Sequence, residues 1–168
     1  MHSCQRGATL VELLVAITLV GMVFAIAVTL FVFGQRTFAL TLAQADLQTS
    51  LTAASEGIVS KVRNAVEVSV SDGASGEGAD CIYLGNHCGV STLIYAKEGA
   101  SEVPLVGTRV EAVQFALASS AGGCVLTIDL ASSSKGRSSE LSKSAYLANI
   151  KGGAFSPGSG SHLRFTLP

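Results

Sequence analysis

Apolar residues fill the first part of the chain almost without a break. From Leu13 to Phe33 there is no charged residue, and at about 1.5 Å per residue a helix of this length crosses a hydrocarbon core roughly 30 Å thick. Glu12 stands in the first turn of this run, and no basic residue lies between Ala8 and Phe33 to pair with it. A charge inside a membrane is costly and usually functional. We therefore expect a membrane-spanning helix at residues 8–34 with a functional carboxylate.

The helical pattern continues beyond the apolar run. Apolar residues recur at steps of three and four, with polar residues between them, and no Pro interrupts residues 8–66. The stripe consists of Leu40, Leu47, Leu51, Ala54, Ile58, Val62 and Val66. This predicts one long helix whose second half, residues 35–66, is amphipathic and needs a globular body to lie against.

After residue 66 the pattern changes to short strands separated by Gly, Ser and Asn clusters. We expect residues 132–139 and 152–160 to form exposed loops. The expected strands are Val66 to Ser71, Cys81 to Leu84, Thr92 to Ala96, Ala112 to Ala118, Val125 to Leu130, Tyr146 to Ile150 and Leu163 to Leu167. Consecutive strands predict an antiparallel sheet, so the chain is α+β, with a long helix packed on a β-rich head at residues 67–168.

Composition adds few candidates for chemistry. The net charge is −1, Lys and Arg are scattered singly, and there is no Trp, so neither a basic patch nor a stacking platform points to nucleic acid. No nucleophile elbow supports a Ser-His-Asp set, and we expect no enzyme.

Three cysteines lie in the predicted head, where an oxidising compartment would favour disulfides. Cys81 and Cys88 flank the turn-like segment Gly85-Asn86-His87 and would clip a hairpin, with Cys124 left over. Cys124 is the alternative partner of either one, and the sequence leaves the three pairings open. We favour Cys81 with Cys88.

We expect no metal and no cofactor. The spacing of the cysteines lacks the close pairs of a structural zinc site. Asp72, Glu77 and Asp80 offer oxygen ligands for calcium in one loop, but the pattern of the twelve-residue calcium loop is absent. A solvated acidic loop is the simpler interpretation.

The segment Gly7-Ala8-Thr9-Leu10-Val11-Glu12-Leu13-Leu14, followed by the apolar run, resembles the amino terminus of type IV pilins and of type II secretion pseudopilins. The resemblance implies a leader at residues 1–7 that prepilin peptidase removes after Gly7, and N-methylation of Ala8. Ala8 is a departure, since the family usually has Phe there. In the filament, Glu12 would pair with the terminal amine of a neighbouring subunit.

The resemblance also implies a location and partners. The prepilin would cross the bacterial inner membrane once, with its head outside the cytoplasm, and then enter a pilus or pseudopilus through the assembly machinery. Its partners would be the lipid bilayer, the peptidase and other pilin subunits. The segments Ile58 to Val66, Val110 to Leu117 and Leu141 to Asn149 are similar to parts of minor pilins and J-type pseudopilins, which implies a minor subunit.

An ordinary export signal is the alternative. Ala25-Ile26-Ala27 has the small-x-small pattern of a signal peptidase site, and the chain would then be a secreted or membrane-anchored binding domain. Against this, the apolar run continues past Ala27 to Phe33, whereas export signals have apolar cores of about 7 to 15 residues. The sequence does not show which machine the subunit would serve.

Overall fold

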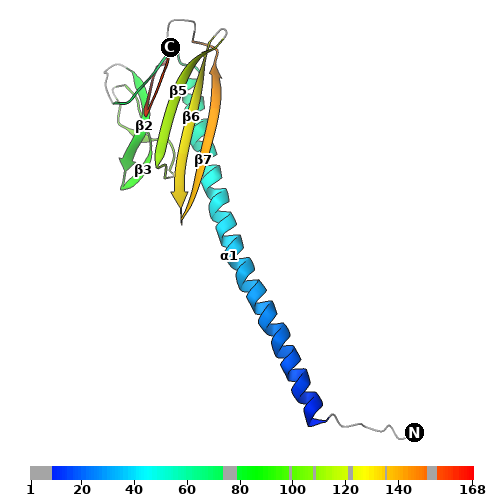
Figure 1. Ribbon diagram of the computed structural model, residues 1–168. Helices are drawn as coiled ribbons and strands as arrows, with labels where there is room; N and C mark the ends of the chain where they lie inside the picture. Colours follow the sequence, from blue (N-terminus) through cyan, green and yellow to red (C-terminus); the bar gives the residue numbers. More distant parts are fainter. Residues whose placement is uncertain are drawn as a thin grey trace, which may run out of the picture. The chain divides into compact units, whose positions relative to one another are not determined.

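The computed structural model describes residues 9–73, 79–98, 100–107, 109–120, 123–134, 136–150 and 155–168. One helix, α1, runs from Leu10 to Val62. The chain divides into two units, Met1–Leu42 and Ala43–Pro168, so α1 contributes to both. The second unit is the head, and it contains the end of α1 and all the strands described below (Figure 1).

The helix ends at Val62, four residues earlier than the predicted boundary at 66. The amide of Arg63 still bonds to the carbonyl of Val59 (2.9 Å), but the amide of Ala65 bonds to Val62 in a tighter turn. The amide of Val66 then donates to the carbonyl of Thr166 at 2.9 Å. Pairing with the last strand therefore takes over where helical bonding stops.

Two sheets make up the head, and the α+β fold class is confirmed. The first has the order β4-β3-β2-β10-β1-β8 and the second the order β7-β6-β5-β9. Pairing is antiparallel except between β1 and β8, which are parallel. The strands are β1 (Glu67–Ser71), β2 (Asp80–His87), β3 (Val90–Ala96), β4 (Val103–Pro104), β5 (Ala112–Ser120), β6 (Gly123–Ser134), β7 (Arg137–Leu147), β8 (Phe155–Ser156), β9 (Gly158–Gly160) and β10 (His162–Thr166).

The predicted loop at residues 132–139 is wrong. These residues continue β6 into β7, with Ser132 paired to Ser139 and Ser134 paired to Arg137. The serines lie opposite one another along a long hairpin, so cross-strand pairing overrides a composition that favours loops. The predicted strand Tyr146 to Ile150 overlaps only the end of β7, and part of the predicted loop at 152–160 forms β8 and β9.

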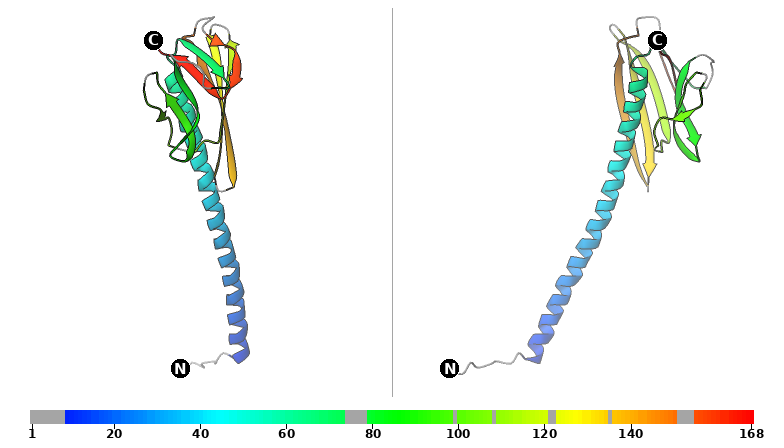
Figure 2. Two further views of the ribbon diagram at one scale, coloured as in Figure 1. Left: turned by 90° about the vertical axis from the view of Figure 1, so that its left-hand side faces the viewer. Right: turned by 180° about the vertical axis from the view of Figure 1, so that it is seen from behind.

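The end of α1 packs on the head through the predicted stripe, from Leu47 onward. Leu47, Leu51, Ala54, Ile58 and Val62 are buried, whereas Leu40 and Val66 are exposed. Figure 2 shows this part of α1 lying along one face of the sheet that contains β5, β6 and β7. The helix residues share one core with buried residues of both sheets, which include Phe115, Leu126, Ile128, Leu163 and Phe165. Burial of this stripe holds the helix to the head.

Polar contacts link α1, and Arg63 directly after it, to the rest of the head. The guanidinium of Arg137 of β7 donates to the side-chain oxygen of Gln44 at 3.5 Å. Lys143 of β7 forms an ion pair with Glu56 of α1, and its hydrogen bond and charge lower the pKa of the Glu56 carboxyl. The ammonium of Lys61 lies 4.8 Å from the centre of the Tyr95 ring, a cation–π contact. The side-chain amide of Asn149 donates to the carbonyl of Arg63 at 3.3 Å.

Tyr95 extends one of these contacts into the first sheet. Its hydroxyl donates to the buried carboxylate of Asp80 at 2.6 Å, and its ring stacks on Phe165 with the ring centres 6.2 Å apart. Burial and this hydrogen bond raise the pKa of Tyr95 to about 12. The backbone amide of Glu98 also donates to Asp80, at 3.0 Å. Both oxygens of the buried Asp80 carboxylate thus accept a hydrogen bond.

Truncating Ile58 tests this packing, because its side chain is fully buried in the shared core. We expect Ile58→Ala to lower the free energy of unfolding by about 2 to 5 kcal/mol through lost burial and a cavity. Gln48→Ala, an exposed change on the same helix, should change it by less than about 0.5 kcal/mol. Urea unfolding in detergent measures both. Equal effects of the two substitutions would contradict the packing.

Candidate processing and assembly site

The first turn of α1 is held by a side-chain cap. The Oγ1 atom of Thr9 accepts a hydrogen bond from the backbone amide of Glu12 at 3.3 Å. The carbonyl of Thr9 accepts the amide of Leu13 at 3.2 Å. Thr9 is therefore the N-cap of the helix, and Glu12 is its third residue.

Glu12 lies where a helix favours a negative charge, because the unpaired amides of the first turn make that end positive. The Glu12 residue is exposed. Among the residues that the structure describes, no basic side chain forms a salt bridge with it. The predicted leader at 1–7, which ends at Gly7, and the predicted new terminus Ala8 lie outside the described residues. The carboxylate is thus open to a partner from outside this part of the chain.

Sequence reasoning missed the role of Thr9. The signal was present in the spacing Thr9-x-x-Glu12, since a Thr followed three residues later by Glu marks the start of many helices. The motif therefore combines two features in four residues. Thr9 fixes where the helix begins, and that start sets the position of Glu12 on the first turn.

The surface that follows is apolar and uncovered. Every residue of α1 up to Leu42 is exposed, and this segment is long and apolar enough to cross a membrane. The hydroxyls of Thr18, Thr29, Thr37 and Thr41 donate to backbone carbonyls of their own helix at 2.8 to 3.0 Å. Their hydrogen bonds need no water, so these residues are compatible with an apolar environment.

The three cysteines of the head are free thiols. Cys81 is the second residue of β2, and Cys88 directly follows the last residue of that strand, His87. The extended strand from Cys81 to His87 spans about 20 Å at 3.3 Å per residue. A disulfide needs Cα atoms within about 7 Å, so the favoured Cys81–Cys88 pair is not formed. Cys124 is buried on β6, in the other sheet, and burial raises the pKa of its thiol.

The mistake lay in the position of the turn. His87 pairs with Val90, and the two residues between them have positive φ angles, 53° for Cys88 and 80° for Gly89. This is the geometry of a tight type I′ hairpin turn. Cys88 is therefore a turn residue at the tip of the hairpin, and Gly85 to His87 belong to the strand.

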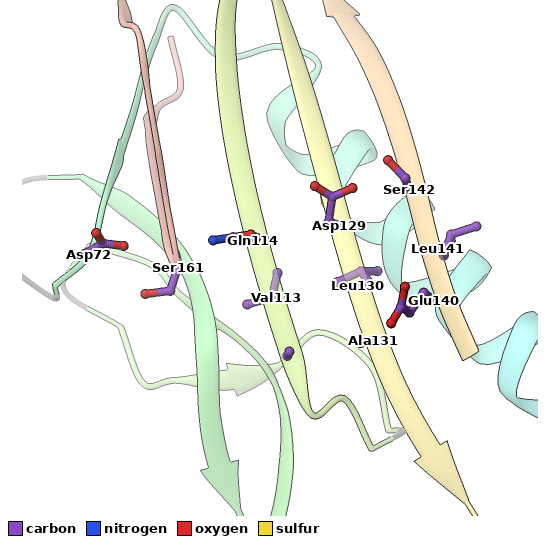
Figure 3. A pocket seen from close by; sticks show the side chains of 11 residues that line it. Asp72, Val113, Gln114, Asp129, Leu130, Ala131, Glu140, Leu141, Ser142 and Ser161 are labelled. Atoms are coloured by element: carbon purple, nitrogen blue, oxygen red, sulfur yellow. The ribbon is translucent and has the colours of Figure 1, made fainter. Parts of the chain in front are cut away.

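A groove of about 510 Å³ crosses the second sheet of the head. Its lining includes three carboxylates, those of Asp72, Asp129 and Glu140, which Figure 3 shows spread along the groove without converging. In the described part of the chain, no three His, Cys, Asp or Glu side chains gather as a metal site requires. Of the acidic loop considered for calcium, Glu77 lies outside the described residues and Asp80 has the hydrogen bonds given above. The three carboxylates of the groove therefore do not form one cluster.

Comparison with known proteins agrees with the N-terminal geometry. Residues 2–28 match the family model described as the prokaryotic N-terminal methylation motif. This match supports the type IV pilin and pseudopilin family, and it covers the site built by Thr9 and Glu12. No curated protein and no solved structure matches the chain.

Removing the cap should loosen the first turn. An N-cap Thr to Ala change costs about 1 kcal/mol, so we expect Thr9→Ala to speed hydrogen exchange at the Glu12 and Leu13 amides about fivefold. Thr9→Ser keeps the hydroxyl and should exchange like the parent. NMR of the protein in detergent micelles measures these amides. Unchanged exchange in Thr9→Ala would show that the hydroxyl does not cap the helix.

Proposed function

We propose that this chain is a structural subunit of a type IV pilus or a type II secretion pseudopilus. It is made as a prepilin in the bacterial inner membrane, cut after Gly7, methylated at Ala8 and assembled through α1. The observation that carries the proposal is a coincidence of two features. The methylation motif at residues 2–28 overlaps the part of α1 in which every side chain is exposed.

An uncovered apolar helix needs an apolar environment. Phe24 and Phe33 are 69% and 70% exposed, and apolar surface of this extent is not stable in water. In the proposal, lipid covers the segment 8–34 while the subunit waits in the membrane, with the head outside the cytoplasm. The same segments of other subunits cover it in the filament core. The segment from 35 to the end of α1 belongs to the stalk that carries the head.

The carboxylate of Glu12 then has a partner. Cutting after Gly7 creates a charged amine at Ala8, and in the filament the Glu12 of one subunit pairs with the amine of another. Each charge alone would be costly in an apolar core, and pairing lowers that cost. The absence of a basic partner among the described residues favours a partner from another subunit.

Features of the head favour a minor subunit. The segments similar to minor pilins and J-type pseudopilins include the end of α1 and the end of β7, and the structure links them through the hydrogen bond from Asn149 to Arg63. A minor subunit would start or cap the filament, with prepilin peptidase and the inner-membrane assembly machinery as partners. The role is structural and needs neither catalysis nor a cofactor.

Processing gives the first test. We expect the protein from membranes to begin at Ala8 and to carry one methyl group on its amine, because the peptidase removes residues 1–7. Intact-mass spectrometry and N-terminal sequencing measure this. A protein that begins at Val28 would be the product of an ordinary signal peptidase, and one that begins at Met1 would be an unprocessed anchor. Either result refutes the proposal.

Glu12 gives the second test. Breaking a buried charge pair costs about 3 kcal/mol or more, so we expect Glu12→Ala to lower incorporation into filaments by more than about tenfold. The measurement is the share of the protein in sheared filaments, by immunoblot against the membrane fraction. Thr29→Ala is the control, since the Thr29 hydroxyl bonds only within its own helix. Normal incorporation of Glu12→Ala would refute the pairing role.

A further inference from the structure

The strand β7 is a free sheet edge. It ends the second sheet, and in the described residues it pairs with β6 alone (Figure 1). With 11 residues it is much longer than the other edge strands, since β4 and β8 have two residues each and β9 has three. A long free edge presents unpaired backbone groups to a strand of another molecule. Among the described edge strands, β7 therefore has the greatest length available for pairing with a strand of a second copy.

One residue of β7 is unusual for its position. Side chains at alternate positions of β7 face α1. They begin with Arg137, whose guanidinium donates to the side-chain oxygen of Gln44 of α1 at 3.5 Å, and continue with Ser139, Leu141, Lys143, Ala145 and Leu147. Lys143 pairs in register with the buried Ile128, so a charged side chain occupies a position on the core face. It bonds to Glu56 of α1 across the rim of the sheet.

The ion pair stays solvated through a groove between α1 and β7. The groove is about 310 Å³ and is lined by Glu56 and Val59 of the helix, by Arg63 directly after it, and by residues 143–147 of the strand. The side chain of Lys143 keeps 31% of its surface exposed, and that of Glu56 keeps 64%. A strand added along β7 would cover this groove. Both charges would then lose water, and the cost of desolvation exceeds what their attraction returns.

We propose that the inward charge of Lys143 closes the free edge of β7 to a strand from a second copy of this chain. An inward charge on an edge strand is tolerated only while the edge meets solvent. Copies of the chain therefore associate without joining their sheets at β7. This inference concerns the head alone and stands whether or not the chain forms filaments.

Cross-linking of the full chain in detergent tests the proposal. The reporter is Ser142→Cys, at an exposed position of β7, with Cys4→Ser, Cys81→Ser and Cys88→Ser to remove the thiols other than the buried Cys124. A short bismaleimide then joins copies whose β7 strands lie together. We expect Lys143→Thr and Lys143→Gln each to raise the cross-linked dimer several-fold over the parent. Two variants are used because Lys143→Gln keeps a longer side chain than Lys143→Thr and serves if Lys143→Thr fails to fold.

Two controls distinguish loss of the Lys143 charge from loss of the ion pair and from association through other surfaces. Glu56→Gln removes the ion pair but keeps the inward charge, so it should not raise cross-linking. A second reporter, Ser119→Cys on β5, is also exposed and detects association that does not involve β7. The proposal is overturned if the folded Lys143 variants do not cross-link more than the parent, if Glu56→Gln cross-links as they do, or if the β5 reporter rises equally.

Discussion

The apolar surface of α1 must be covered, and the rest of the structure depends on how this is achieved. From Leu47 onward the head covers one stripe of the helix, with Leu51, Ile58 and Val62 almost fully buried. Up to Leu42 nothing in the described chain covers it. One helix thus has two kinds of surface, one satisfied within the chain and one that needs lipid or other subunits. The cap at Thr9 and the carboxylate of Glu12 stand at the end of the uncovered part.

The head covers the last part of the helix through packing and polar contacts. Its two sheets and α1 share a single core, and polar contacts from Lys143, Tyr95 and Asn149 fix the helix at its rim. The ion pair of Lys143 with Glu56 helps to hold β7 to the helix. In our proposal its charge also keeps the edge of the sheet solvated.

The sequence predicts the helix well because its signals are local. A run without charge and a stripe at steps of three and four need no knowledge of the fold. The sequence does not show where along the helix the head begins to cover it. Leu40 and Leu47 lie on the same stripe, yet only Leu47 is buried, because burial depends on how far the sheets extend along the helix. The Ser-rich hairpin and the Cys88–Gly89 turn were missed for a similar reason. Pairing between the two consecutive strands of each hairpin decides both, and Cys is a rare choice for a positive φ. Of the site, the motif shows Glu12, whereas the partner that we propose for its carboxylate would come from another molecule and leaves no signal in this sequence.

The account is tested most directly by finding what covers the first half of α1. A photoreactive side chain at Ile17, which is 63% exposed, would capture its neighbours in cells with and without the assembly machinery. The account predicts lipid adducts without assembly and adducts to other pilin subunits in filaments. A mature protein that lacks Ile17, or one whose Ile17 captures neither lipid nor subunits, would contradict it.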